Sequence, residues 1–255
     1  MAQVFGEPGR NAAEESYKTT RRFLLIAFLS IAALSVIWGF ALGSVLPLTR
    51  LPWPVAVSIL FLALFLAFLI GHWATQKMDA VDRERMSWRK GALGEWLAAE
   101  TLKSLPNDYA VINDVTKKLG NIDHVVIGPT GVYVINAKNW KGTVSADGKG
   151  ELLVNRRSPD KPAIKNMLTG VMDFQTKLTA LTEGDYFVRG LLVFPIAYVE
   201  ADFGSTRHIH CLRDDRLVDY IQNKTFAQSL SSDDVDRITR ATLQLAGMDK
   251  RFASV

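Results

Sequence analysis

Two long apolar runs near the start of the chain set its first part off from the rest. Phe23 to Leu46 has no charged residue, and Val55 to Ile70 is apolar again after a short segment with Pro47, Arg50 and Pro52. A helix needs about 20 apolar residues to cross a hydrocarbon core of ~30 Å. The pattern therefore predicts two transmembrane helices within residues 23–73.

Two other interpretations of these runs are disfavoured. A secretory signal has an apolar core of about 7–15 residues, whereas the first run is longer and a second run follows directly. A helical pair buried in a soluble core is the other alternative, and two uncharged runs in succession argue against it. We expect a membrane hairpin.

Basic residues flank the hairpin unevenly. They precede the first run and follow the second, while the connecting segment holds only Arg50; the flanking residues are Arg10, Lys18, Arg21, Arg22, Lys77, Arg83, Arg85, Arg89 and Lys90. Because cytoplasmic flanks carry the excess of Lys and Arg, both termini and the soluble domain are expected in the cytoplasm, at the inner (cytoplasmic) membrane of a bacterium. Residues 1–22 are interpreted as a mobile cytoplasmic arm and residues 74–90 as a basic linker helix.

After residue 90 the pattern alternates between strands and helices. A helix with an apolar stripe is predicted from Gly91 to about Ser104, and a strand from Tyr109 to Val115. Further strands are expected within residues 122–135, 144–154, 188–194 and 206–212, with helices near 164–181 and 212–223. Residues 91–222 therefore form an α/β domain, and residues 223–255 a helical extension beginning near Ser231 or Ser232.

The segment from Ile122 to Ile135 has the signature of a β-hairpin with a turn at Gly128-Pro129-Thr130-Gly131. If Gly128 faces Gly131, Asp123 pairs with Asn136, and Lys138 shares the face of Asn136. A one-residue slip would separate them. A carboxylate can hold a divalent ion that activates water, and a lysine can orient that water, so the cluster suits phosphodiester chemistry. The alternative is an edge hairpin with a solvated polar end.

Three ordered motifs in this region resemble the nuclease-related domain, a distant branch of the PD-(D/E)XK nuclease superfamily. They are Gly91-Ala92-Leu93-Gly94-Glu95, Ile122-Asp123-His124 and the run from Gly131 to Trp140 (GVYVINAKNW). The resemblance covers about residues 88–220 and implies a restriction-endonuclease-like mixed sheet flanked by helices, behind the two-helix anchor.

The resemblance also implies roles for particular residues. Asp123, Asn136 and the carbonyl of Ala137 would bind Mg²⁺, Lys138 would be the catalytic lysine, and Glu95 would add an acid from the helix. Asn136 stands where the family usually has Glu, so metal binding should be weaker. A second departure lies in the family's Asn-Pro-x-x-Gln motif, of which Asn166 remains; Gln175 is the candidate substitute for its Gln.

Composition permits a nucleic-acid partner without requiring one. The formal net charge is +4, and Lys117, Lys118 and Lys141 near the hairpin could form a basic rim for a phosphate backbone, DNA more than RNA, or simply a solvated loop. The single cysteine, Cys211, rules out an intramolecular disulfide and is expected to be buried. The chain has no Walker A loop, nucleophile elbow or zinc-finger spacing.

Three functions stay open at this stage. The first is a Mg²⁺-dependent nuclease-like enzyme with a degenerate metal site, in which Glu95 or another acid such as Glu151 replaces the missing Glu. The second is an inactive nuclease fold that binds nucleic acid or a protein partner at the membrane. The third is a structural membrane protein whose soluble domain mediates assembly.

Overall fold

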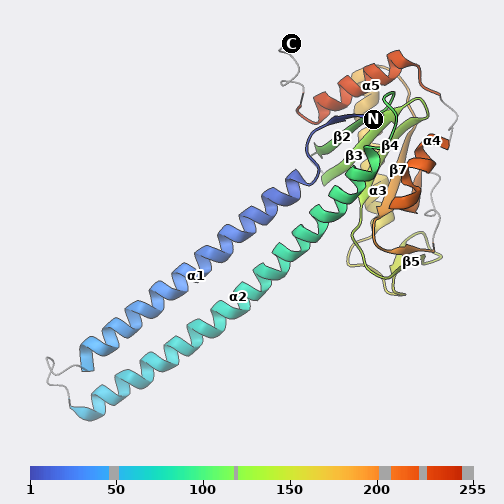
Figure 1. Ribbon diagram of the computed structural model, residues 1–255. Coiled ribbons are helices and arrows are strands. Elements are labelled where there is room, and N and C mark those ends of the chain that lie inside the picture. The colour runs from blue at the N-terminus through green and yellow to red at the C-terminus, as the bar shows by residue number, and fades with distance from the viewer. Residues whose placement is uncertain (46–51, 118–119, 201–207, 224–228, 249–255) are drawn as a thin grey trace. The chain divides into compact units, whose positions relative to one another are not determined.

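The computed structural model describes residues 1–45, 52–117, 120–200, 208–223 and 229–248 (Figure 1). The chain divides into two compact units. One unit comprises residues 13–89, and the other comprises residues 1–12 together with residues 90–255.

The first unit is a pair of helices, α1 (Arg10–Val45) and the first part of α2 (Trp53–Leu102). Side chains buried between them are small and recur at every eleventh residue; they are Thr19, Ser30 and Ala41 on α1, and Ala63 and Ala74 on α2. An 11-residue spacing keeps positions on one side of a helix, and small residues let two backbones approach closely. Near the charged ends, the Arg85 guanidinium lies 5.7 Å from the centroid of the Phe23 ring.

The outward surface of this helix pair is apolar. Large side chains on it are more than half exposed, among them Leu24, Phe28, Phe61, Phe65 and Phe68. In the most apolar stretch of each helix, the buried share of the residues is 0% in α1 and 6% in α2. Both helices are thus long and apolar enough to cross a membrane. In α2 the charged residues begin at Lys77, so the later part of the helix lies outside this apolar segment.

A six-stranded mixed sheet forms the centre of the second unit, in the order β1-β2-β3-β4-β7-β9. The strands β2, β3 and β4 run antiparallel to one another, and the pairs β1–β2, β4–β7 and β7–β9 are parallel. The strands are β1 (Gln3–Phe5), β2 (Ala110–Lys117), β3 (Gly120–Gly128), β4 (Gly131–Ala137), β7 (Val188–Phe194) and β9 (Ile209–Arg213). With its flanking helices the unit is a mixed α/β fold, as the sequence predicts.

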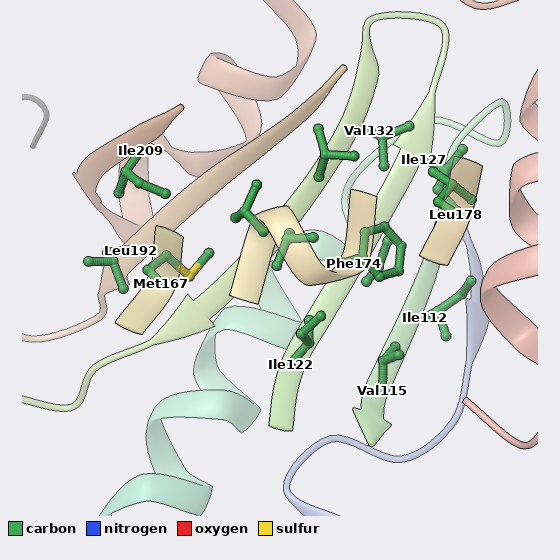
Figure 2. Packing of buried hydrophobic residues seen from close by; sticks show 14 of the residues in the cluster. Ile112, Val115, Ile122, Ile127, Val132, Met167, Phe174, Leu178, Leu192 and Ile209 are labelled. Atoms are coloured by element: carbon green, nitrogen blue, oxygen red, sulfur yellow. The ribbon is translucent and has the colours of Figure 1, made fainter. Parts of the chain in front are cut away.

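Helices cover both faces of this sheet because its strands are apolar on both sides. In β4, Val132 and Val134 join a core with α3 (Ala163–Thr182) and α5 (Ser232–Leu245). Tyr133 and Ile135 join a second core with the end of α2 and with α4 (Leu217–Asn223), which follows the 3-10 turn η2 (Asp214–Arg216). Figure 2 shows Met167, Phe174 and Leu178 of α3 lying over the sheet. Alternate residues of one strand therefore anchor opposite layers.

A second, three-stranded sheet has the order β6-β5-β8 and comprises β5 (Thr143–Ala146), β6 (Leu152–Val154) and β8 (Tyr198–Val199). Just before β6, Glu151 accepts hydrogen bonds from the backbone N–H groups of Ile164 (3.0 Å) and Lys165 (2.8 Å). Its carboxylate therefore caps the first turn of α3, where Pro162 provides no side-chain cap. This engagement argues against Glu151 as the acid that replaces the missing Glu.

Two expectations about the chain's organisation differ from the structure. The linker helix and the first domain helix are one continuous helix, α2, because no proline interrupts it between residues 74 and 102. The expected mobile arm does not extend over residues 1–12, because β1 pairs with β2 from Gln3↔Ala110 to Phe5↔Ile112. The strand escapes sequence reasoning because it has only three residues.

Candidate active site at the end of the β3–β4 hairpin

The hairpin has the register that the sequence predicts. Gly128 pairs with Gly131, and the ladder runs back to His124↔Ile135. It stops one residue before Asp123 and Asn136, which come next on the two strands. Their backbones are therefore not paired by the ladder, and their side chains accept backbone hydrogen bonds instead.

Asp123 is bound to the end of β4 by two hydrogen bonds. Its carboxylate Oδ2 accepts the N–H of Ala137 at 2.8 Å, and its own N–H donates to Oδ1 of Asn136 at 3.3 Å. The side chain is 9% exposed. Ala137 therefore contacts Asp123 through the Ala137 N–H. The resemblance to the family instead implies that the Ala137 carbonyl binds the metal.

The helix α2 brings Glu95 to the same place. Burial, reinforced by the negative charges of Asp123 and Asp114, raises the pKa of Glu95 to about 8. The positive charge of Lys138 and a hydrogen bond from the Gly9 N–H offset part of this rise. Glu95, Asp123 and Lys138 are thus close enough to interact electrostatically.

Burial and the neighbouring charges also shift the pKa of Asp123. Burial raises the pKa of its carboxyl to about 6, while Lys138 and the Ala137 N–H lower it and Asp114 raises it further. The next residue, His124, is fully buried, and burial lowers its pKa to about 4. A neutral ring at pH 7 can donate from Nδ1 to Oδ1 of Asn113, 2.8 Å away.

Asp114 is a third acid at the site, and sequence reasoning missed it. The β2–β3 ladder passes from Asn113↔His124 to Val115↔Ile122, so Asp114 and Asp123 occupy opposed positions that the ladder skips. Asp114 is 5% exposed and has φ +57°. The available signal is a charged residue inside a β-rich run, and the strand prediction is correct because Asp114 lies within β2.

The left-handed backbone of Asp114 also changes the direction of the residues that follow. Ile112 and Val115, three residues apart, both join the core on the α3 side, where regular alternation would place them on opposite faces. Across the ladder, Ile122 and Val125 show the same departure. The acids therefore lie where regular strand geometry is interrupted.

The remaining predicted residues are less closely tied to the site. Lys141 is exposed just after the hairpin. Of Lys117 only the backbone is described, and Lys118 lies outside the described residues. The Oε1 of Gln175 on α3 is buried without a hydrogen-bond partner in the described part of the chain. Trp140 packs on Phe194, with ring centroids 5.4 Å apart, which agrees with a structural role.

The two histidines on or next to β9 contact different side chains. The ring of His208 lies 5.0 Å from that of Phe187, centroid to centroid. His210 Nε2 lies 2.8 Å from Nη1 of Arg189. Each histidine therefore has its own neighbouring side chain, Phe187 for His208 and Arg189 for His210.

The chemistry of the acid cluster suits Mg²⁺. The donors at hand are carboxylate and amide oxygens, which hard divalent cations prefer. The pKa values of Glu95 and Asp123 are raised mainly by burial, and the neighbouring acids raise them further. Among the described residues, no three His, Cys, Asp or Glu side chains stand at ligand spacing around one point. The residues thus match a Mg²⁺ site in the type of donor atom and not in ligand spacing.

Comparison with known proteins finds a family match over the part of the chain that contains these residues. The model of the family described as "Nuclease-related domain" matches residues 90–195, which include Glu95, Asp114, Asp123, Asn136 and Lys138. No solved structure matches the chain. An uncharacterized protein of Bacillus anthracis is 35% identical over 78 residues, which is 28% of this chain and 37% of that protein. The chain thus matches little more than a third of that relative's length. Residues 90–195 of this chain are a nuclease-related domain.

Proposed function

We propose that the chain is a membrane-anchored protein whose nuclease-related domain acts on nucleic acid as a Mg²⁺-dependent nuclease with a weakened metal site. The observation that carries this proposal is the convergence of Glu95, Asp123 and Lys138 at the end of the β3–β4 hairpin, inside the matched family domain. Acids that bind a cation beside a lysine form one arrangement that can catalyse phosphodiester hydrolysis.

Each residue has a role that follows from its surroundings. Asp123 and Glu95 would hold the metal, and Asn136 would add a neutral amide oxygen. Lys138, whose charge already acts on both acids, would stabilise charge that develops on a phosphoryl oxygen. When bound, Mg²⁺ supplies a Lewis acid that polarises the phosphoryl group and lowers the pKa of a bound water.

Asp114 supplies the negative charge that Asn136 lacks. It acts electrostatically on both Glu95 and Asp123 from its opposed position on β2. Together with Asp123 it compensates for the amide at position 136. Glu95, whose raised pKa keeps it largely protonated near pH 7, would release its proton when a divalent cation binds.

The second candidate function is a binding module without catalysis. Its support is that the Oδ1 of Asn136 already accepts the Asp123 N–H, and that no three acids of the described residues stand at ligand spacing. Such a domain would bind nucleic acid or a protein partner at the membrane and would not cleave.

A plasmid-nicking assay on the full chain in detergent micelles, with Mg²⁺ or Mn²⁺, distinguishes the nuclease from the binding module. Asp123→Asn removes the charge while keeping the shape of the side chain, and Asp233→Asn, at an exposed position on α5, is the matched control. Nicking that is lost in Asp123→Asn and kept in Asp233→Asn supports the nuclease. Nicking that persists in Asp123→Asn refutes it, and nucleic-acid binding without any nicking favours the binding module.

The nucleic-acid partner is proposed to be DNA, contacted through a basic rim near the hairpin. Lys141 is the exposed member of that rim whose side chain is described. Removing one phosphate contact should reduce the salt dependence of binding by about one unit of slope. Lys141→Ala should therefore weaken binding to duplexes of any sequence, whereas Lys103→Ala, which removes an exposed lysine paired with Glu100, should not. A preference for RNA over DNA of the same sequence would contradict the choice of DNA.

A further inference from the structure

The segment before the first apolar helix is attached to the acid cluster at several points. In β1, the Gln3 N–H donates to the carbonyl of Tyr109 at 2.9 Å. Farther along, Nδ2 of Asn113 donates to the carbonyl of Gly6 at 3.2 Å. Gly6 has φ +76°, and a Cβ there would lie 2.8 Å from the carbonyl oxygen of Asn113. The segment therefore follows β2 closely as far as the site.

Asn11 then contacts Asp114 directly. Its backbone N–H donates to Oδ2 of Asp114 at 3.1 Å, and its Nδ2 donates to Oδ1 at 2.5 Å. Asn11 lies in the first turn of α1, where backbone N–H groups have no partner within the helix. Asp114 thus satisfies one of these donors, and the positive end of the helix dipole favours its negative charge.

The same segment approaches the helix that carries a second acid: a Cβ at Gly9 would lie 3.4 Å from the Cβ of Ala92, and the Gly9 N–H lowers the pKa of Glu95. Residues that precede the apolar part of α1 therefore bind one acid of the site and act electrostatically on another. These residues lie outside the range 90–195 that the family model matches. Their contribution is a feature of this chain beyond the matched domain.

The backbone of Asp114 needs such support. A non-glycine residue at positive φ is strained and persists only where its surroundings determine its conformation. The two hydrogen bonds from Asn11 fix both carboxylate oxygens of Asp114 and so determine where its charge lies.

We propose that residues 3–11 are a built-in part of the acid cluster and that Asn11 is the positioning residue that holds Asp114 in it. This inference rests on the proposed function, since it concerns the placement of a metal-binding acid. It also links the first turn of α1 to the chemistry, because the residue that orients the acid belongs to that helix.

The test is Mn²⁺ binding to the full chain in detergent micelles, followed by electron paramagnetic resonance. Asn11→Ala removes the side-chain donor. Alanine favours helix more than asparagine, so the variant does not weaken α1. The matched control is Asn223→Ala, which removes an Asn–Asp hydrogen bond on the exposed surface of α4.

Loss of a residue that orients a metal ligand typically costs about 10–100-fold in affinity. We expect Asn11→Ala to weaken Mn²⁺ binding at least about tenfold and to alter the spectrum of bound Mn²⁺, with Asn223→Ala matching the wild type. Equal affinity and an unchanged spectrum in Asn11→Ala would overturn this inference and leave the proposed function standing. A wild-type chain that binds no Mn²⁺ would overturn both.

Discussion

Asn136 gives the site an amide beside Asp123, at a position where the family usually has a carboxylate. Its Oδ1 accepts the Asp123 N–H and so helps to fix the backbone of the acid. An amide oxygen can ligate a cation but adds no charge, and Mg²⁺ prefers carboxylates among its few protein ligands. The substitution should therefore lower metal affinity without removing the site.

Restoring the family residue tests this interpretation. Asn136→Glu adds a fourth carboxylate next to Glu95, Asp114 and Asp123. In EDTA we expect the variant to be less stable than the wild type by about 1–3 kcal/mol, because like charges are buried together. With Mg²⁺ the order should reverse. Thermal unfolding of the variant and the wild type in EDTA and in Mg²⁺ measures these differences. If the variant and the wild type had the same melting temperature in each condition, position 136 would not face the metal.

The raised pKa values predict how stability depends on pH in EDTA. A carboxyl group whose pKa is higher in the folded state binds more protons there than in the unfolded state. For Glu95 this holds between its ordinary pKa of 4.5 and about 8, and for Asp123 between 3.8 and about 6. The free energy of unfolding should therefore fall as the pH rises from 4.5 to 8. Glu95→Gln should flatten the upper part of this decline in a series of denaturant titrations, and an unchanged slope would contradict the assignment.

Some residues of the site could be predicted from sequence and others could not. Asp123, Asn136 and Lys138 follow from one hairpin, because the turn fixes the register and the register fixes the faces. Asn11 and Asp114 are 103 residues apart in sequence, so their contact arises only from the fold. No local pattern links a helix start to a strand that far away.

At the scale of elements, α2 and the end of β4 meet through a close contact at Gly94. A Cβ at Gly94 would lie 2.9 Å from the Cβ of Asn139 and 3.3 Å from its backbone nitrogen. Nδ2 of Asn139 in turn donates to the carbonyl of Lys90 at 2.7 Å. This contact holds the helix that contains Glu95 against the strand that leads to Lys138.

Replacing Gly91 or Gly94 by alanine should therefore change the free energy of unfolding in opposite directions. Gly91→Ala meets nothing within 4 Å and should stabilise the protein by about 0.5–1 kcal/mol, because glycine disfavours helix. Gly94→Ala must push Asn139 away and should destabilise it by about 1–3 kcal/mol. Chemical denaturation of both variants measures the difference, and a stabilising Gly94→Ala would show that helix and strand are not in close contact there.

The strongly patterned elements could be predicted, and the weakly patterned ones could not. The hairpin, α3, β7 and α5 lie close to the predicted ranges, and Ser231 caps α5 by accepting the N–H of Asp234. The strand β1 and the unbroken course of α2 were missed. A three-residue strand has too few positions to show a period, and glycines inside a helix are tolerated when packing requires them.

At the scale of the whole molecule, the apolar surface of α1 and α2 requires a partner. Large exposed apolar patches mark interaction surfaces, and the length and composition of the two helices suit a membrane span. The basic residues on both flanks, including Arg22 and Lys77, favour a cytoplasmic soluble domain. Membrane anchoring in this orientation is a proposal that the two helices support by length and composition.

Anchoring predicts that the full chain stays in the membrane pellet after carbonate extraction at high pH. A fluorescent reporter at the C-terminus that requires the cytoplasm to fold should be active, and a periplasm-dependent reporter at the same place should be inactive. A chain released into the supernatant, or the reverse reporter pattern, would contradict the proposed topology.

The central claim is that the acid cluster binds a divalent cation, and calorimetric titration of Mn²⁺ into the full chain tests it most directly. The full chain is required because residues 1–12 belong to the same compact unit as the nuclease-related domain. We predict one site in the wild type and its loss in Asp123→Asn, with Asp233→Asn unchanged. No binding at millimolar Mn²⁺, or equal binding in Asp123→Asn, would contradict the claim.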